Sequence, residues 1–237
     1  MYTLDHKNSK IWLDLCTYCN AGCPQCHRTD PNGLKKQPWL PLIQWSLETF
    51  KKSFPVETLK FIYEFQICGT WGDPIMNKDI YKICEYVIKN SECLLTLNTN
   101  GSLRDEFWWY SLGHLCKNRL EVYFDIDGTT QEMHSLYRQN TNLQKILDNM
   151  KALSVFSKPI TFIILFKHNK NFVEDIKALA RSYGCTSFCV IPSNRWNMMT
   201  KDYYDDNVER VGEKVISLSF TNHKKEKFKI EKIDDKM

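Results

Sequence analysis

Four of the ten cysteines in this 237-residue chain fall within one short segment, CTYCNAGCPQCH, at positions 16, 19, 23 and 26. Thiolates are soft ligands that hold zinc ions or iron–sulfur clusters, and paired thiols also carry redox chemistry. Three uses of this segment are therefore open: a structural zinc site, a thioredoxin-like redox pair and an iron–sulfur cluster.

The spacing of the thiols disfavours the first two uses. A structural zinc site usually takes two Cys-x-x-Cys pairs that lie a dozen or more residues apart, whereas only three residues separate Cys19 from Cys23. A thioredoxin-like site needs one such pair at the start of a helix, but this segment contains two pairs and a proline after Cys23. The pattern favours an iron–sulfur cluster, with a zinc knuckle as the alternative.

Alternating strand-like and helix-like segments must position these thiols. The expected strands are 10–16, 58–67, 93–98, 120–126, 160–166 and 187–192. The expected helices are 41–53, 79–89, 104–115, 142–156 and 172–183. Apolar residues recur at helical spacing in 142–156, and 160–166 is the continuous apolar run of a strand buried on both faces. Six successive βα-type units predict an α/β fold whose parallel sheet is open or curled towards a barrel.

The composition is that of an ordinary soluble domain. Hydrophobic residues make up 43% of the chain, and a net charge of +4 is too small to indicate nucleic acid as a partner. No apolar run approaches the roughly 18 residues that span a bilayer. Because residues 1–10 lack the apolar stretch of a signal peptide, we expect a cytoplasmic protein with no membrane partner. Thiols stay reduced there, which argues against a disulfide scaffold.

The pattern Cys19-x3-Cys23-x2-Cys26, just after the first expected strand, resembles the cluster loop of the radical S-adenosylmethionine (radical SAM) enzymes. The resemblance implies that these three cysteines hold three irons of one [4Fe–4S] cluster. The fourth iron would bind the amino and carboxylate groups of S-adenosylmethionine (AdoMet). Cys16 would then be the last residue of the strand and not a ligand.

Polar turns after four later strands fall where that family places its AdoMet contacts. The turns are CGTWGDP at 68–74, NTNGS at 98–102, DIDGTTQEMHSLYR at 125–138 and FKHN at 166–169. They follow the carboxyl ends of strands, where parallel barrels build their active sites. The cofactor-binding residues that this implies are His27, Gly72, Asp73, Asn100, Asp125 and Arg138.

Each implied contact has a physical reason. Gly72 would let the backbone approach the ligand, and Asp73 would place a negative charge near an ammonium group. Arg138 would pair with the AdoMet carboxylate through its fork of donors. Asp125 would accept hydrogen bonds from ribose hydroxyls, and the His27 imidazole would pack against the cluster or the adenine.

Several positions depart from the family pattern. Asp73 replaces a glutamate, which shortens the side chain by one methylene, and Asp125 replaces a serine. Trp71 stands where a glycine is common, so this turn needs support to follow the usual backbone path. His134 and His168 follow strands on the expected active face and are candidates for substrate contact.

The resemblance covers roughly residues 10–195 and implies a partial (β/α)6 TIM-like barrel. We expect a lead-in at 1–9, a core domain at 10–195 and a short charged C-terminal extension at 196–237, either a solvated tail or a terminal helix. Cys185-x3-Cys189 is followed by no further cysteine, so we expect no auxiliary cluster domain.

The implied activity is reductive cleavage of AdoMet to a 5′-deoxyadenosyl radical, which abstracts hydrogen from a small molecule, nucleotide or peptide. The cluster and AdoMet would carry the chemistry, in an enzyme of oxidoreductase or transferase type. A flavodoxin- or ferredoxin-type protein is the expected electron donor. The alternative is a non-catalytic module on a degenerate barrel, whose thiols bind zinc or a cluster only to hold a protein partner.

Overall fold

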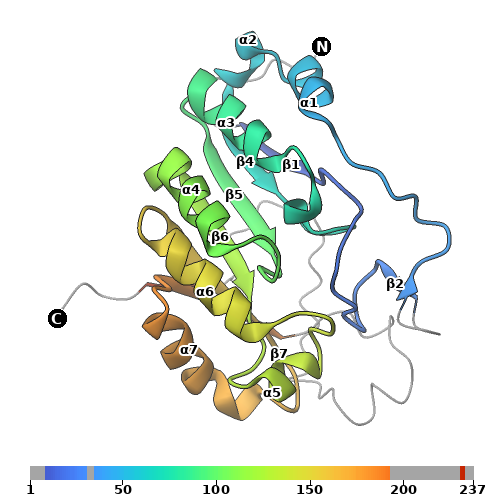
Figure 1. Ribbon diagram of the computed structural model, residues 1–237, viewed down its shortest axis with the longest axis vertical. Helices are drawn as coiled ribbons and strands as arrows, with labels where there is room; N and C mark the ends of the chain where they lie inside the picture. Colours follow the sequence, from blue (N-terminus) through green and yellow to red (C-terminus); the bar gives the residue numbers. More distant parts are fainter. Residues whose placement is uncertain (1–8, 31–34, 193–229, 233–237) are drawn as a thin grey trace.

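The structure is a computed structural model that describes residues 9–30, 35–192 and 230–232. Its centre is a seven-stranded sheet with the order β1-β4-β5-β6-β7-β8-β9 (Figure 1). The first six strands of this sheet run parallel: β1 (Ser9–Leu13), β4 (Ile62–Ile67), β5 (Leu94–Thr99), β6 (Leu120–Asp125), β7 (Lys158–Leu165) and β8 (Ser187–Pro192). The predicted α/β fold, a partial TIM-like barrel with parallel strands, is confirmed.

The helices that connect these strands follow one another along one face of the sheet (Figure 1). The main helices are α1 (Leu47–Ser53), α3 (Ile80–Asn90), α4 (Glu106–Cys116), α6 (Leu143–Ser154) and α7 (Val173–Ser182). Shorter ones are α2 (Val56–Leu59), α5 (Gln131–Ser135), η1 (Pro74–Met76), η2 (Lys117–Arg119) and η3 (Lys170–Phe172). Side-chain caps at Ser46, Asp105 and Asn142 accept backbone N–H groups and begin α1, α4 and α6.

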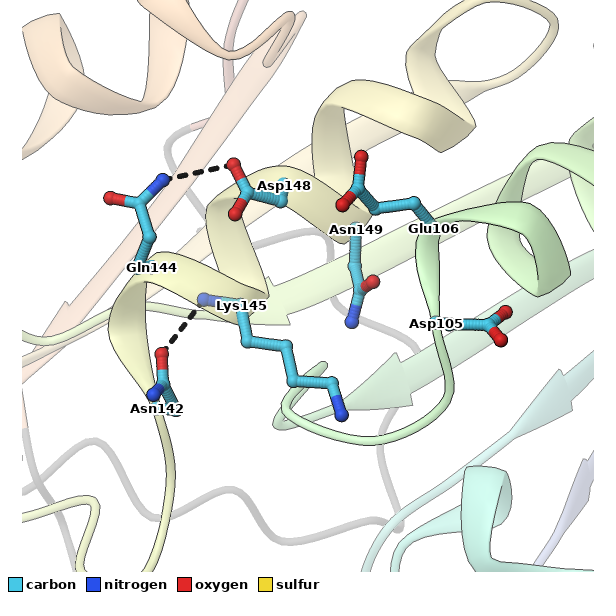
Figure 2. A pocket seen from close by; sticks show the side chains of 7 residues that line it. All are labelled: Asp105, Glu106, Asn142, Gln144, Lys145, Asp148 and Asn149. Atoms are coloured by element: carbon cyan, nitrogen blue, oxygen red, sulfur yellow. Dashed lines mark hydrogen bonds between the residues drawn. The ribbon is translucent and has the colours of Figure 1, made fainter.

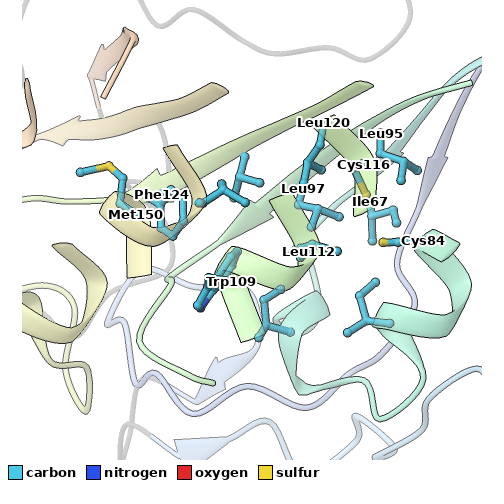
Figure 3. Packing of buried hydrophobic residues seen from close by; sticks show 14 of the residues in the cluster. Ile67, Cys84, Leu95, Leu97, Trp109, Leu112, Cys116, Leu120, Phe124 and Met150 are labelled. Atoms are coloured by element: carbon cyan, nitrogen blue, oxygen red, sulfur yellow. The ribbon is translucent and has the colours of Figure 1, made fainter. Parts of the chain in front are cut away.

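The main core lies between the sheet and this helical layer (Figure 3). Trp109 of α4 is fully buried, and its ring lies 5.0 Å from that of Phe124 in β6. Cys84, Cys93 and Cys116 are buried in the same core, where they act as small apolar side chains. No helix in the described ranges is both long and apolar enough to cross a bilayer.

On the opposite face of the sheet, which lines the inside of the open barrel, strands β1, β4 and β5 carry polar side chains. Side chains alternate between the two faces of a strand, and residues paired in a parallel ladder share a face. Lys10 pairs with Glu64 at 2.9 Å, and the Thr96 hydroxyl donates to the same carboxylate oxygen at 2.7 Å. Gln66 donates to Asn98 at 3.3 Å. Across β1, β4 and β5 the sheet therefore separates an apolar core from polar side chains. The same face is apolar at β7, where Ile160 and Phe162 lie opposite Tyr123 and Asp125 of β6.

Two local features differ from the sequence-based expectation. Strand β1 ends at Leu13 rather than Cys16, and Cys16 forms only an isolated bridge with Gln44. Strand β9 (Ile230–Lys232) pairs antiparallel with β8, so these residues are neither a solvated tail nor a terminal helix. The free edge of β8 offers unpaired backbone groups, which a short extended segment satisfies. Residues 1–8, 193–229 and 233–237, with most of the expected lead-in and C-terminal extension, lie outside the described residues.

Candidate functional site

The cysteine-rich loop follows β1 at the carboxyl edge of the sheet, where Thr17 holds it in place. The Thr17 backbone N–H donates to the Ile43 carbonyl at 2.9 Å, and the Ile43 N–H donates to the Thr17 hydroxyl at 2.8 Å. That hydroxyl donates in turn to the Pro41 carbonyl at 2.6 Å. Arg28, two residues after Cys26, donates to the Thr17 carbonyl at 3.0 Å. The loop is thus tied to the segment around residues 41–43 and to its own far end.

Cys19, Cys23 and Cys26 gather in one small cluster with Tyr137 and Phe166. All three thiols are free, and Cys23 is the most deeply buried of them. Burial raises the pKa of Cys23 to about 12 and also raises the pKa of Cys19 above its usual value. Without a metal, these two thiols keep their protons at neutral pH. The loop therefore brings together the three cysteines predicted as ligands.

Cys16 is not among the residues of this cluster. Its thiol donates to the Asp73 carbonyl at 3.0 Å, and burial raises its pKa to about 11. Three thiols gathered in one cluster, with Cys16 hydrogen-bonded elsewhere, suit a four-iron cluster with one open iron. They do not suit the closed four-cysteine shell of structural zinc. In the described residues no three His, Cys, Asp or Glu side chains are placed to hold a single metal ion. Because a cluster takes each thiolate on a different iron, its ligands need not converge on one point.

Asp73 joins the turn after β4 to the turn after β5. It is 4% exposed, and its carboxylate accepts hydrogen bonds from the Thr99 hydroxyl at 2.8 Å and from the Ile75 N–H at 3.0 Å. Asn100 donates to it twice, from its backbone N–H at 2.8 Å and from Nδ2 at 2.6 Å. Burial raises the pKa of Asp73 against the effect of these hydrogen bonds. These four donors occupy the four lone-pair sites of the carboxylate, so Asp73 has no free site for a ligand. Its place in the structure is to hold Thr99 and Asn100 in position.

Asn100 reaches from that junction to the cysteine-rich loop. Its Nδ2 lies 2.9 Å from the Asn20 side-chain oxygen and 3.9 Å from the Cys19 sulfur. Its own side-chain oxygen accepts the Ser102 N–H at 3.0 Å, which shapes the turn. The structure therefore brings the predicted residues Asp73 and Asn100 into direct contact beside a predicted ligand.

Gly72 is required by the backbone of the cysteine-rich loop. A Cβ atom at this position would lie 2.3 Å from the Cys16 carbonyl oxygen and 2.7 Å from that of Tyr18. The next residue, Asp73, donates its N–H to the Tyr18 carbonyl at 2.7 Å. The close approach expected between Gly72 and a ligand is thus an approach between two segments of this chain, and AdoMet contact at Gly72 stays a prediction.

Trp71 is accommodated in this turn by Asp14, which the sequence analysis did not identify. The Asp14 carboxylate accepts the N–H groups of Thr70 at 2.9 Å and Trp71 at 3.3 Å, and so supports the turn where a glycine is absent. The Trp71 ring lies 6.0 Å from the ring of His27, the residue after Cys26. His27 therefore sits beside the predicted ligands in an aromatic environment.

Arg138 is buried between two aspartates. Its Nη1 pairs with Asp125 at 2.8 Å and its Nε pairs with Asp127 at 2.6 Å. Burial alone would lower the pKa of Arg138, but the two carboxylates together raise it well above its usual value. Nη1 also lies 3.9 Å from the Cys23 sulfur, which places a fixed positive charge beside a predicted ligand. Arg138 and Asp125, predicted separately as AdoMet contacts, are partners of each other.

Asp127 is a further buried partner of Arg138 that the sequence analysis did not single out. It is fully buried, and its second oxygen accepts the Ile164 N–H of β7 at 2.7 Å. The signal was present, because Asp127 is the second carboxylate of the DIDG turn and Arg138 follows it by eleven residues. It links β7 to the arginine beside Cys23.

The two histidine candidates differ in their surroundings. His134 is fully buried, with Nδ1 accepting the Asp127 N–H at 3.3 Å and Nε2 lying 2.9 Å from the Thr141 hydroxyl. Its candidacy for substrate contact is therefore wrong, because both nitrogens serve the fold. His168 stacks on Phe166 at 5.4 Å, and neither of its nitrogens has a hydrogen-bond partner among the described residues. His168 keeps its candidacy beside the cysteine cluster.

Acidification is expected to destabilise the protein through His134. Burial, with a smaller effect from Arg138, lowers the pKa of His134 from 6.5 to about 3. Between those values the unfolded chain binds the extra proton, so this contribution is complete above pH 6.5 and is lost as the pH falls. We expect a loss of about 2 kcal/mol between pH 7 and pH 5.

Urea unfolding across this pH range measures the loss. In the variant His134→Gln, which does not titrate, the free energy of unfolding should fall less steeply between pH 7 and pH 5. If the free energy of unfolding falls equally steeply with pH in the variant and the wild type, His134 does not cause the acid sensitivity.

Figure 2 shows a pocket of about 370 Å³ on the outer helical layer. Its lining comes from α4, α6 and the residues just before them: Asp105, Glu106, Asn142, Gln144, Lys145, Asp148 and Asn149. The Asn149 amide donates to the carbonyls of Gly101 at 2.8 Å and Leu103 at 3.2 Å. It thereby supports the turn that carries Asn100. None of the predicted site residues lines this pocket, so the candidate site remains at the cysteine-rich loop.

Comparisons with known proteins show a fold relationship. No protein-family model and no curated protein sequence matches this chain. Solved structures of radical SAM enzymes do match it. Streptococcus suis SuiB bound to S-adenosylmethionine has a TM-score of 0.59 and 12% identity, over 77% of this chain and 40% of SuiB. Native anSMEcpe with bound AdoMet has a TM-score of 0.58 and 16% identity, over 77% of this chain and 50% of that protein.

Methylornithine synthase (PylB) has a TM-score of 0.53 and 11% identity, over 77% of this chain and 52% of PylB. The match thus spans about half the length of these proteins or less. At such identities the likeness shows a shared fold, and it confirms the sequence-based resemblance at that level.

Proposed function

We propose that this chain is a radical SAM enzyme, with Cys19, Cys23 and Cys26 holding one [4Fe–4S] cluster beside a bound AdoMet. The observation that carries the proposal is the geometry of the thiols. Three free cysteines gather with Tyr137 and Phe166 at the carboxyl edge of a parallel sheet, while Cys16 is withdrawn. The fold shared with SuiB and anSMEcpe, whose structures contain AdoMet, supports it.

The cofactors would supply one-electron reductive cleavage of a carbon–sulfur bond in AdoMet and a carbon radical that removes hydrogen from a substrate. The chain supplies the surroundings. Tyr137 is 2% exposed and Phe166 is fully buried, so the inner side of the cysteine cluster is shielded from water. Arg138 holds its positive charge 3.9 Å from the Cys23 sulfur, where it would offset part of the negative charge of a thiolate-bound cluster.

The polar residues around the cysteines divide into two roles. Asp73 and Gly72 would hold the cysteine-rich loop and Asn100 in position, since their contacts are with the chain itself. Asn100 and Asp125 would contact AdoMet, because Asn100 lies beside Cys19 and the Asp125 side chain is 21% exposed towards the open barrel. Arg138 would bind the AdoMet carboxylate only by sharing donors with its two aspartates.

An anaerobic assay of AdoMet cleavage tests the proposal. The chain is reconstituted with iron and sulfide, reduced with dithionite and mixed with AdoMet, and 5′-deoxyadenosine is measured by chromatography. We expect about four irons per chain, a visible iron–sulfur absorption band and product formation. The variant Cys23→Ala should lose the band and the product.

The variant Cys116→Ala is the matched control. Cys116 is buried in the outer core, away from the cysteine cluster, so this variant should bind a full cluster and form product. A wild-type protein that takes up zinc, and no cluster after reconstitution, would contradict the proposal and favour a non-catalytic metal-binding module.

A further inference from the structure

An aromatic series leads from the predicted cluster ligands to the protein surface. His27 follows Cys26 in sequence, and its ring lies 6.0 Å from that of Trp71. The Trp71 ring in turn meets Trp39 edge-on at 5.3 Å. Trp39 is 61% exposed, so the series ends at solvent. Three rings from three separate segments thus connect the cysteine-rich loop with one surface position.

The surface around Trp39 is an exposed apolar patch, which we call the Trp39 patch and define as Trp39, Leu42 and Ile43. Leu42 is 45% exposed and Ile43 is 55% exposed, whereas the nearby Leu40 is buried. These three exposed side chains lie within five consecutive residues. Grouped exposed apolar side chains mark an interaction surface more often than isolated ones do. Most of the hydrophobic side chains in the rest of the described chain are packed in the two cores.

The Trp39 patch is fixed to the cysteine-rich loop by hydrogen bonds. The Thr17 backbone and side chain bind the carbonyls of Pro41 and Ile43, and the Tyr18 hydroxyl donates to the Leu42 carbonyl at 3.4 Å. A partner docked on the patch would therefore sit at a set position relative to Cys19, which follows Tyr18 directly.

Positive charges border the Trp39 patch. The Lys36 ammonium group donates to the carbonyls of Gln37 and Leu40 at 2.7 Å, on either side of Trp39 in sequence. Arg28 donates to the carbonyl of Thr17, the residue whose hydroxyl accepts the N–H of Ile43 in the patch. Asp30, the acidic residue of the small hairpin formed by β2 (Thr29–Asp30) and β3 (Lys35–Lys36), stands across from Lys35 in register. An apolar centre with a basic rim is complementary to an acidic protein surface.

We propose that the Trp39 patch is the docking surface for an acidic one-electron carrier protein, and that the Trp39–Trp71–His27 series lies between its cofactor and the cluster. This inference rests on the proposed function. In the transfer step the reduced carrier loses one electron, the cluster gains it, and no bond forms or breaks. A small patch suits such a partner, because electron-transfer complexes are weak and use little area.

Stopped-flow reduction of the reconstituted protein tests the docking surface. Photoreduced flavodoxin and reduced ferredoxin are each mixed with it, and bleaching of the cluster absorption gives a second-order rate. Ile43→Glu, which places a negative charge in the patch, should lower this rate about tenfold, and Trp39→Ala should lower it several-fold. Titration calorimetry with the same carriers should show the matching loss of affinity. Raising the salt concentration should slow the wild-type reaction.

Two variants on the helical layer are matched controls. Phe107 is 78% exposed and Val155 is 59% exposed, so Phe107→Ala and Val155→Glu repeat the same chemical changes on another surface. Both should keep the wild-type rate and affinity. Dithionite, which is small and needs no docking surface, should bleach all five proteins alike.

Reduction by dithionite separates failure of the docking surface from failure of the proposed function. If dithionite bleaches every protein and both carriers reduce the patch variants at the wild-type rate, the docking surface is overturned and the proposed function stands. If the patch variants change only the oligomeric state, the patch binds a second copy and the inference is likewise overturned. If the wild type forms no cluster that dithionite bleaches, the proposed function fails and the docking surface falls with it.

Discussion

Replacing Arg138 with methionine is expected to lower the free energy of unfolding by about 3–5 kcal/mol. The guanidinium is the shared partner of Asp125 and Asp127, at 2.8 and 2.6 Å. Asp127 is fully buried, so removing the arginine leaves at least one carboxylate excluded from water and without its counter-ion. Urea unfolding at pH 7 measures the loss.

The comparison variants for Arg138 separate charge from shape. Arg138→Lys keeps the positive charge but loses the forked guanidinium that reaches both aspartates. Its free energy of unfolding should therefore lie between those of the wild type and Arg138→Met. Adding Asp125→Asn to Arg138→Met should recover part of the stability, because one unpaired charge is removed. Arg181→Met, at an exposed arginine that lies over the Phe188 ring, should cost less than about 1 kcal/mol. A loss at Arg138 no larger than the loss at Arg181 would contradict the buried-triad explanation.

Substituting alanine for Gly72 is expected to displace the cysteine-rich loop and prevent normal cluster assembly. The new Cβ would lie 2.3 Å from the Cys16 carbonyl oxygen, and this neighbour is backbone that cannot rotate away. Overpacking of this kind costs about 1–3 kcal/mol, and the strain falls on the segment that carries the ligands. We expect lower stability in urea and an iron content well below that of the wild type after reconstitution.

Gly113→Ala provides the matched control for Gly72. Gly113 is also buried, but it lies in α4, and its nearest neighbour to a new Cβ is the Leu153 carbonyl at 3.0 Å. Alanine is favoured over glycine in a helix by up to about 1 kcal/mol, which offsets this tighter contact. Gly113→Ala should therefore take up a full cluster. If Gly72→Ala did so as well, with wild-type stability, the close approach at Gly72 would not be what requires a glycine.

Most of the framework could be predicted from the sequence because it depends on local patterns. Apolar runs such as 160–166 indicate strands, and β7 forms at Lys158–Leu165. Strand boundaries were predicted less accurately, because an apolar pattern does not show where strand pairing stops. Strand β1 ends at Leu13, three residues before Cys16, although Leu15 and Cys16 are buried. Strand β9 was missed, because three residues pair with β8 only once that edge exists.

The sequence predicted which residues gather at the candidate site, but it did not predict which of them contact one another. The spacing of Cys19, Cys23 and Cys26 indicates one group of thiols, since a loop this short keeps them close. Whether Asp73 faces a ligand or its own chain depends on Thr99 and Asn100, which lie 26 and 27 residues further along. No spacing rule connects positions so far apart.

The sequence by itself determined the parallel sheet, the gathering of three thiols after its first strand and the placing of polar turns at one edge. These follow from periodicity and from the rule that the carboxyl ends of parallel strands meet. Only the tertiary structure decided which polar groups already have partners: Asp73 has four donors and Arg138 has two aspartates. It also showed that the close approach at Gly72 is made by the backbone of the cysteine-rich loop. The reason is that burial and hydrogen-bond partners come from distant segments, and they exist only once those segments pack together.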